Sequence, residues 1–468
     1  MPRRKGRDVT AERGKVIPHE QIPPQDPPLR PVPREFGTSV QALTDATYEQ
    51  LRLEHPLVAE TFRRCFPVAL ATTTQILPDG TTFVGGGDLE NMWLRDAAGA
   101  LEPFVRLCAG DQELYHVVVG AIRRMSLYLV LEPYGNSFSK EPTLHDNYWP
   151  TDDPPPGPWL RERKWSVDSP CGLLKLACEL HAATGELAFA DGAFLEAART
   201  IIMTLRTEQD HANASEYRFV RDDPAHPEDT LSHNGRGAPV APTGMIWSGF
   251  RPSDDPCRYG YPIAQNMLAS VLLRWLSSVL RDHYVDSALA DMAARMSAEI
   301  RVGIETYGIV EHPRWGSIYA AETDGLGNYA LLDDATPPNL VGAPLTGYLG
   351  LDDPTYQRTR AFALSADNPY FISGPYAEGL GSPHRNASPA NYVWHIGLIV
   401  HGLTAGTEEE QRRMIELCAP TTAGTGFMHE AFDVRDPNRY IRGWCAWNDS
   451  QFGALVLEWI RRRQAAAS

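Results

Sequence analysis

The chain of 468 residues has few cysteines, and none of them form a close pair. No two cysteines have the CxxC spacing of zinc knuckles and dithiol redox motifs. Their number is odd and they are scattered, so a disulfide framework is not indicated either. We therefore expect reduced thiols and no structural zinc. The positions are Cys65, Cys108, Cys171, Cys178, Cys257, Cys418 and Cys445.

Long apolar runs and an excess of basic charge are also missing. No stretch of about 18 consecutive apolar residues is present, so no membrane span is predicted. The 43 Lys and Arg residues are outnumbered by 59 Asp and Glu residues, for a net charge of −16. Nucleic acids and anionic membranes bind positive surfaces, so neither is an expected partner. No apolar segment follows the basic first residues, so we expect no signal peptide and a cytoplasmic location.

The sequence contains three partial matches to nucleotide-binding or metal-binding motifs, and each lacks a residue or spacing that the motif requires. Gly85–Gly87 lacks the Lys-Ser/Thr of a phosphate-binding loop. His429–Glu430 lacks the second histidine of a zinc hydrolase, and Asp333–Asp334 lacks EF-hand spacing. We therefore expect neither a metal nor a cofactor.

Apolar periodicity predicts a mostly helical domain behind a polar arm. Residues 1–38 are rich in Pro, Arg and Gln and are expected to form an extended or disordered arm. Residues 39–468 are expected to form a single domain. Its clearest helix runs from Ile263 to Arg281, where apolar side chains recur on one helical face. Further helices are predicted at 96–109, 113–131, 171–184, 190–206, 286–302, 392–404, 408–418 and 447–463.

Long polar connections separate these helices and contain most of the Gly, Pro, Trp and Asp residues. They cover 132–168, 207–262, 305–390 and 420–446. Loops of this length in a compact domain are usually functional. Helices joined alternately by short turns and long loops predict a toroid of helical hairpins, with the loops gathered around a pocket at one end.

The segment Trp247–Asp255 carries the strongest chemical signal in these loops. It combines two adjacent carboxylates, Asp254 and Asp255, with Arg251 and two aromatic residues. Burial of neighbouring carboxylates raises the pKa of one of them, which suits a general acid. An Asx-type turn after Pro252 is the alternative for either residue taken alone.

Two further loops supply complementary groups. Asp88, Arg95 and Asp96 can hold sugar hydroxyls through charge-assisted hydrogen bonds. A helix N-cap is the alternative for Asp96. Glu430, which lies near aromatic residues late in the chain, suits a base that activates water. Two separated carboxylates, aromatic platforms and no metal or nucleotide motif point to glycoside hydrolysis, which uses one carboxyl as acid and one as base or nucleophile.

The same motifs resemble those of glycoside hydrolase family 125, the exo-α-1,6-mannosidases. They occur in the family's order and cover nearly everything except the arm. The matching stretches are DLENMWLRD at 88–96, WLRERKWSVDSPCG at 159–172, PTGMIWSGFRPSDD at 242–255, AETDGLGNYALLDDA at 321–335, NPYF at 368–371, GLGSPH at 379–384, YVWHI at 392–396, and GFMHEAFD and RGWCAWNDS within 426–450.

This resemblance implies an all-α (α/α)6 barrel and a metal-independent, inverting release of terminal mannose from α-1,6-mannosides. It implies that an Asp of the RPSDD motif is the general acid, Asp254 being preferred over Asp255, and that Glu430 is the general base. A mannose-containing oligosaccharide is then the expected partner. Candidate contacts to the terminal mannose are Asp88, Trp93, Arg95, Asp96, Trp247, Arg251, His384 and Trp394.

Two other functions remain compatible with a helical toroid. One is a sugar isomerase or epimerase, which would use histidines such as His384 or His429 as acid and base. The other is a glycan-binding protein without activity. The natural glycan, the oligomeric state and the role of the arm do not follow from the sequence.

Overall fold

The computed structural model describes residues 34–142, 151–223, 226–384 and 389–467. The predicted arm, residues 1–38, lies outside the described residues as far as residue 33. Residues 34–38 are helical and not part of an extended arm, because helix α1 begins at Arg34. The fold is predominantly helical. The longer helices are α1 (Arg34–Leu51), α2 (Pro56–Cys65), α3 (Leu94–Leu101), α4 (Gln112–Leu131), α5 (Asp168–Thr184), α6 (Gly192–Glu208), α9 (Ile263–Asp282), α10 (Ser287–Tyr307), α11 (Pro354–Ala363), α12 (His395–Leu403), α13 (Glu408–Cys418) and α14 (Ala446–Ala467).

Polar caps explain where several of these helices begin. The carboxylates of Asp111, Asp191 and Asp286 accept backbone N–H bonds at the starts of α4, α6 and α10. These bonds satisfy amides that have no partner within the helix. Helix α5 ends at Gly185, whose φ of 73° is the left-handed conformation that glycine adopts without strain. The predicted helices therefore start and stop close to where the pattern placed them.

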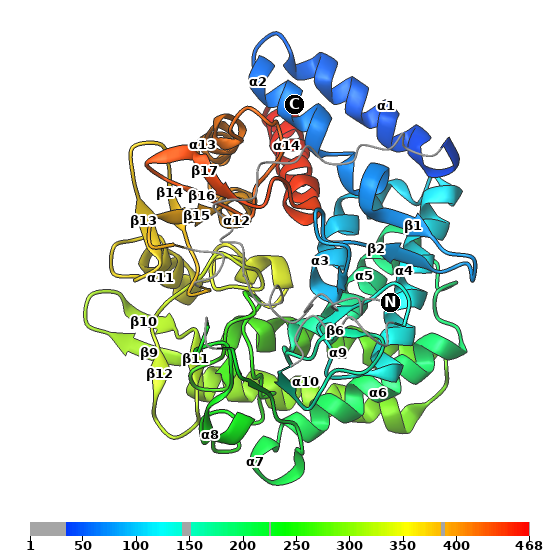
Figure 1. Ribbon diagram of the computed structural model, residues 1–468, viewed down its shortest axis with the longest axis vertical. Coiled ribbons are helices and arrows are strands. Elements are labelled where there is room, and N and C mark those ends of the chain that lie inside the picture. The colour runs from blue at the N-terminus through cyan, green and yellow to red at the C-terminus, as the bar shows by residue number, and fades with distance from the viewer. Residues whose placement is uncertain (1–33, 143–150, 224–225, 385–388, 468) are drawn as a thin grey trace, which may run out of the picture.

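The helices follow one another around a ring, which is visible in the colour order of Figure 1. Helix α3 packs against both α5 and α14, α5 packs against α9, and α12 packs against α14. Helices α4, α6, α10 and α13 pack on the outside of these, and α2 contacts α14, so the two ends of the described chain meet. The approach of α5 to α3 needs glycine: a Cβ at Gly172 would lie 2.7 Å from the carbonyl oxygen of Leu94.

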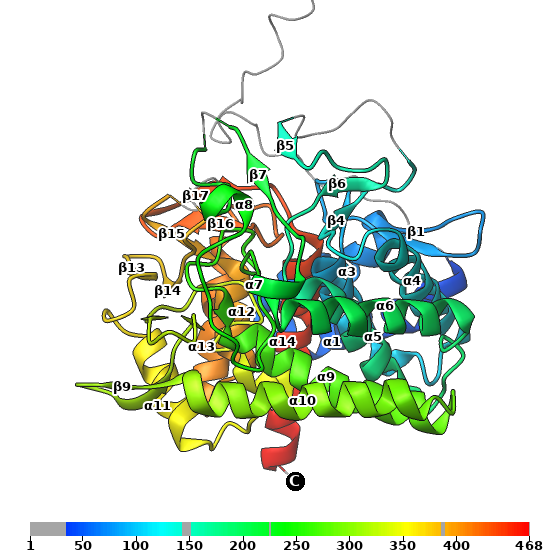
Figure 2. The same ribbon diagram turned by 90° about the horizontal axis from the view of Figure 1, so that it is seen from below.

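The connections carry short antiparallel strands rather than unstructured loops. Figure 2 shows strands β4–β7 and β15–β17 gathered at the end of the molecule opposite α9 and α10. The sheets that matter for the site are β3–β4–β6, β12–β11–β8 and β15–β16–β17. Their strands are β3 (Met92–Trp93), β4 (Ser137–Phe138), β6 (Leu160–Glu162), β8 (Tyr261–Pro262), β11 (Glu322–Thr323), β12 (Tyr329–Ala330), β15 (Tyr392–Trp394), β16 (Ala431–Asp433) and β17 (Asp436–Ile441).

The remaining elements are short. They are the π-helix η2 (Ala69–Thr73), the 3-10 helices η3 (Glu102–Leu107), η4 (Ala343–Thr346) and η5 (Ala419–Thr421), the helices α7 (His211–Ala214) and α8 (Ser232–Gly235), and the strands β1 (Thr74–Ile76), β2 (Thr82–Val84), β5 (Asp152–Asp153), β7 (Val220–Arg221), β9 (Ile309–His312), β10 (Gly316–Tyr319), β13 (Phe371–Ser373) and β14 (Glu378–Leu380).

Two helices within the described ranges are long and apolar enough to cross a membrane. These are α4 and α9, each of 20 residues. The interior of the protein buries 72% of the apolar window of α4 and 78% of that of α9. Both helices therefore form part of the core, which explains their composition.

Candidate active site

The loop that contains Asp254 and Asp255 forms a tight, internally bonded turn. The backbone N–H of Arg251 donates to the carbonyl of Asp255 at 2.9 Å, and that of Asp254 donates to the carbonyl of Arg251 at 3.0 Å. Asp254 has a φ of 66°, a left-handed conformation that is uncommon for a residue other than glycine. Such strained residues concentrate at functional sites, where the surrounding structure holds them in place.

Asp255 is engaged in holding this turn together. Its carboxylate lies 2.5 Å from the guanidinium of Arg251 and accepts a hydrogen bond of 2.5 Å from the hydroxyl of Ser253. Arg251 also pairs with the buried Glu322 at 2.5 Å. The Glu322 carboxylate in turn accepts the backbone N–H groups of Arg258 and Tyr259. Both oxygens of Asp255 are therefore committed to the loop.

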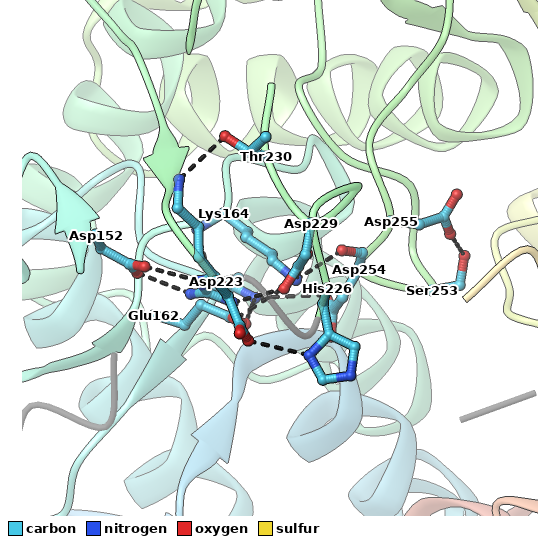
Figure 3. A network of polar contacts seen from close by, with 12 residues as sticks. Asp152, Glu162, Lys164, Asp223, His226, Asp229, Thr230, Ser253, Asp254 and Asp255 are labelled. Atoms are coloured by element: carbon cyan, nitrogen blue, oxygen red, sulfur yellow. Dashed lines mark hydrogen bonds and ion pairs between the residues drawn. The ribbon is translucent and has the colours of Figure 1, made fainter. Parts of the chain in front are cut away.

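The side chain of Asp254 has a different environment from that of its neighbour. Figure 3 shows it on the side of a polar network, whereas Asp255 is turned toward Ser253. Its hydrogen-bond donor is the amide of Asn136, at a distance of 3.4 Å from Oδ1. Burial raises the pKa of Asp254 to about 8, Glu162 adds to the rise, and Arg95 opposes it. Asp254 is thus a carboxylic acid that keeps its proton at neutral pH.

Glu430 lies immediately before strand β16. Its backbone N–H donates to the carbonyl of Ile441 on β17 at 3.1 Å, which fixes the residue at the edge of that sheet. Its Oε1 lies 3.8 Å from the guanidinium of Arg442. Burial raises the pKa of Glu430 to about 7, and Arg442 limits the rise while Asp88 adds to it. Glu430 therefore titrates near neutrality and can both accept and release a proton.

The start of helix α3 carries charges that act on both of these carboxyl groups. Arg95 pairs with Asp96 at 2.9 Å and with the buried Asp168 at 3.0 Å. The charges of Arg95 and Asp96 both act on the pKa of Asp254 and on that of Glu430. The structure thus brings together three segments that are far apart in the sequence.

Asp96 and Asp168 do not cap the helices that they begin. Trp93 occupies the N-cap position of α3 and Val167 that of α5, and neither helix has a side-chain cap bond. The N-cap alternative for Asp96 is therefore wrong. Asp168 instead accepts hydrogen bonds from Arg95 and Ser166.

Asp88 belongs to the same region through Arg442. The guanidinium of Arg442 donates to Asp88 at 2.7 Å and to the carbonyl of Gly86 at 2.7 Å. Arg442 therefore connects the glycine-rich segment to the loop that carries Glu430. Like Asp254, it has a left-handed backbone, with a φ of 57°.

The three predicted tryptophan contacts are placed differently. Trp247 is only 1% exposed and stacks on His211 with ring centroids 3.5 Å apart, so it belongs to the core beneath the loop. Trp93 is partly buried on β3, and Trp394 is 6% exposed on β15. Within the described residues, the indole N–H groups of Trp93 and Trp394 have no hydrogen-bond partner.

The two histidines that an isomerase would use are both held in their neutral form. Burial lowers the pKa of His384, and Lys164 lowers it further. Burial lowers the pKa of His429 to about 4. The ring of His429 stacks on Tyr440 at 3.7 Å, and its Nδ1 faces the carbonyls of Arg442 and Gly443. His429 thus supports the loop of Glu430 from within.

The Asp333–Asp334 pair also serves the protein backbone. Asp333 accepts the N–H groups of Leu340 and Val341, each at 2.9 Å. Asp334 lies 3.0 Å from the hydroxyl oxygen of Ser253 and so supports the turn that carries Asp254. Across the described ranges, no group of three or more His, Cys, Asp or Glu side chains is arranged to hold a metal ion.

The sequence did not single out a buried ionic network next to Asp254. Arg221 pairs with Asp152 at 2.7 Å, with Glu162 at 2.9 Å and with Asp229 at 2.8 Å. Lys164 lies in the same cluster, 2.7 Å from Asp229 (Figure 3). Glu162 and Lys164 lie in the stretch 159–172, which resembles a motif of the family, so the sequence could have pointed to these two residues. Asp152, Arg221 and Asp229 belong to no such motif.

Comparison with known proteins agrees with this geometry. Residues 55–457 match the family model described as metal-independent alpha-mannosidase (GH125). A Streptococcus pneumoniae metal-independent alpha mannosidase, solved as a non-productive complex with alpha-1,6-mannobiose, superposes with a TM-score of 0.87 at 39% identity. The match covers 91% of this chain and 99% of the other. The meiotically up-regulated gene 157 protein of Schizosaccharomyces pombe is 33% identical over 94% of this chain and 91% of its own length.

A more distant structure shares the fold alone. It is a bacterial glucoamylase in complex with acarbose, with a TM-score of 0.52 at 11% identity, over 86% of this chain and 55% of the other.

A carboxyl that keeps its proton and a second carboxyl that ionises near neutrality are the two kinds of group that glycoside hydrolysis uses. The match over most of the chain then gives the family: the protein belongs to the metal-independent alpha-mannosidases of family GH125.

Proposed function

We propose that this α-mannosidase is exo-acting, cleaves α-1,6-linked mannosides and inverts the anomeric configuration. The observation that carries the proposal is the pair of environments around Asp254 and Glu430, one carboxyl protonated at neutral pH and the other ionising near pH 7. The α-1,6 linkage is supported by the similarity to the S. pneumoniae enzyme, whose structure contains alpha-1,6-mannobiose.

Asp254 acts as the general acid. Its elevated pKa keeps the proton available, and the acid transfers that proton to the glycosidic oxygen as the bond to the anomeric carbon breaks. Asp255 is unsuited to this task because Arg251 and Ser253 already occupy its two oxygens. This difference between neighbours supports the choice that the resemblance alone leaves open.

Glu430 acts as the general base. In its ionised form it takes a proton from a water molecule, which attacks the anomeric carbon from the side opposite the leaving group. Arg442 faces the carboxylate and stabilises the ionised form. An inverting site separates its two carboxyl groups by about 6.5–9.5 Å to leave room for this water.

The terminal mannose is bound by the groups around these carboxyls. We assign contacts to Asp88, Trp93, Arg95, Asp96, Arg251, His384 and Trp394. Trp93 is partly buried on β3, directly before the helix that carries Arg95 and Asp96. Trp247 supports the acid loop from the core instead.

The scaffold is an (α/α)6 barrel within a single domain, which begins with helix α1 at Arg34 rather than at the predicted residue 39. Helices α3, α5, α9, α12 and α14, together with the short helix η4, form the inner positions, and the outer helices pack on them. The contacts that run from η4 through α9, α5, α3 and α14 to α12 support this arrangement.

A panel of α-1,2-, α-1,3- and α-1,6-mannobiosides tests the proposal, with mannose release as the readout. Release from the α-1,6 isomer alone is expected, and Glu430→Gln should abolish it while the circular dichroism spectrum stays unchanged. Glu416→Gln, at an exposed helical ion pair with Arg412, is the matched control. Comparable release from all three isomers would contradict the linkage assignment, and full turnover by Glu430→Gln would contradict the mechanism.

A further inference from the structure

The buried network around Arg221 is an unusual neighbour for a catalytic acid. The Arg221 side chain is fully buried and binds Asp152 through two hydrogen bonds of 2.7 Å. The same guanidinium reaches Glu162 and Asp229. Because buried ion clusters are costly to desolvate, packing alone would be served as well by apolar side chains. The position of the network beside Asp254 suggests a further role.

Lys164 connects the network to the backbone of Asp254. Its ammonium lies 2.7 Å from Asp229 and 3.5 Å from Glu162, and it donates to the carbonyl oxygen of Asp254 at 2.8 Å. That carbonyl belongs to a residue in the left-handed conformation. The ammonium therefore helps to hold the strained backbone from which the acid extends.

Asn136 connects the network to the carboxyl group of Asp254. The backbone N–H of Lys164 donates to Asn136 Oδ1 at 3.0 Å, which fixes the orientation of the amide. Asn136 Nδ2 then donates to Glu162 at 3.1 Å and to Asp254 Oδ1 at 3.4 Å. Since Oδ1 accepts this bond, the proton of the neutral carboxyl is left to Oδ2.

We propose that Asn136, Glu162 and Lys164 are positioning residues for Asp254: Asn136 and Lys164 orient the residue, Asn136 leaves the proton to Oδ2, and the negative charge of Glu162 disfavours ionisation of the carboxyl. The inference rests on the proposed role of Asp254 as the general acid. The network contains three carboxylates and two cations, so an ionised Asp254 would add negative charge where negative charge is already in excess.

The charge of Glu162 has the sign that its proposed role requires, because it raises the pKa of Asp254. Burial is the largest cause of its raised pKa, and Glu162 and Asp96 raise the pKa further, while Arg95 and Lys164 lower it. Burial opposes the ionisation of Glu162, but Lys164 and Arg221 lower the pKa of this carboxyl to about 2. Glu162 is therefore negatively charged at every pH at which Asp254 titrates.

Other charged groups face this region as well. Arg251 and Asp255 lie on the same loop, Asp229 belongs to the network, and His384 senses the charges of Lys164 and Asp255. Among the network's carboxylates, Glu162 is the one whose charge raises the pKa of Asp254. Substitution of Glu162 is therefore the direct test of the charge effect.

The pH profile of kcat/KM on α-1,6-mannobiose tests the charge effect. Glu162→Gln keeps an acceptor for Asn136 but removes a negative charge, so the alkaline limb should move to lower pH by about one unit. Lys164→Met removes a positive charge and should move that limb to higher pH. The exposed Glu216→Gln is the matched control and should leave the limb in place. A folded Glu162→Gln variant with an unchanged alkaline limb would overturn the inference.

The dependence on the leaving group tests the orientation effect without changing a charge. Asn136→Ala should reduce kcat on α-1,6-mannobiose by about tenfold, because a misplaced acid protonates the leaving oxygen poorly. On dinitrophenyl α-mannoside, whose leaving group needs no proton, kcat should change by less than about twofold. Equal losses on both substrates would overturn the inference, and this test decides the matter if Glu162→Gln does not fold.

A wrong assignment of Asp254 as the general acid would give a different experimental result from a wrong assignment of the positioning residues. If Asp254→Asn retains activity on α-1,6-mannobiose, the proposed acid is wrong and the inference falls with it. If Asp254→Asn is inactive on that substrate while the variants of Asn136 and Glu162 behave like the control, only the positioning role is overturned.

Discussion

Asp254 and Asp255 are adjacent in the chain, yet their carboxyl groups have different partners. Asp255 is bound by Arg251 and Ser253 at 2.5 Å each, whereas Asp254 receives one long hydrogen bond from Asn136 and has a pKa of about 8. The left-handed backbone of Asp254 directs the two side chains to these separate environments. Asp255 therefore holds the loop, and Asp254 is the residue that we propose as the general acid.

Substituting the two aspartates should separate these roles. Asp254→Asn is expected to lower kcat on α-1,6-mannobiose by about 10²–10⁴, the usual contribution of a general acid, with little change in thermal stability. Asp255→Asn removes one of the two carboxylates that pair with the buried Arg251 and leaves only Glu322, so this variant should have a lower thermal midpoint. Steady-state kinetics and thermal unfolding of both variants provide the comparison. A stable, inactive Asp255→Asn beside an active Asp254→Asn would reverse the assignment.

The pH dependence of kcat/KM should be a narrow bell. The base must be ionised, so activity is lost as pH falls through about 7, the pKa of Glu430. The acid must be protonated, so activity is lost as pH rises through about 8, the pKa of Asp254. The profile of the free enzyme reports both groups. Activity that stays constant from pH 8 to about 10 would show that no group like Asp254 donates a proton.

Arg442 should set the acidic limb of this profile. Its guanidinium lies 3.8 Å from Glu430 and lowers the pKa of that carboxyl, so Arg442→Gln should move the acidic limb to higher pH. Activity at pH 6 should then fall more than activity at pH 8. Arg435→Gln, an exposed arginine between β16 and β17, is the matched control. A uniform loss of activity at every pH would indicate that Arg442 acts only on the shape of the loop.

Trp247 and Trp93 should respond differently to truncation. Trp247 is packed on His211 in the core, and Trp→Ala at such a site costs about 3–5 kcal/mol through lost burial and the cavity left behind. Trp247→Ala should therefore lower the thermal midpoint strongly. Trp93→Ala should instead lower kcat/KM with a smaller change in that midpoint. The reverse pattern would place Trp247 at the sugar.

The sequence predicted much of the helical framework because that information is local. The apolar stripe of 263–281 became α9, Ile263–Asp282, and the other predicted helices lie close to their observed bounds. Helix α11, Pro354–Ala363, was missed inside a region read as loop, although Asp353 and Pro354 form a typical helix start. The short strands were missed because two to six residues are too few for an alternating pattern.

The site could be predicted only in part. Local composition and the family motifs identified Asp254 and Glu430, and the structure brings both near Arg95. The network of Arg221 could not be found in this way, because its partners lie up to 69 residues apart and share no local pattern. Trp247 was chosen as a sugar contact for its place in the motif, but the motif is also what builds the core under the loop.

The anomeric configuration of the first product tests the central claim most directly. Proton NMR of α-1,6-mannobiose, followed from the first minutes of hydrolysis, distinguishes β-mannose from α-mannose before mutarotation mixes them. Direct attack by a water molecule activated by Glu430 predicts that β-mannose forms first. Initial formation of α-mannose would contradict the account, because it would require a covalent intermediate and a different role for Glu430.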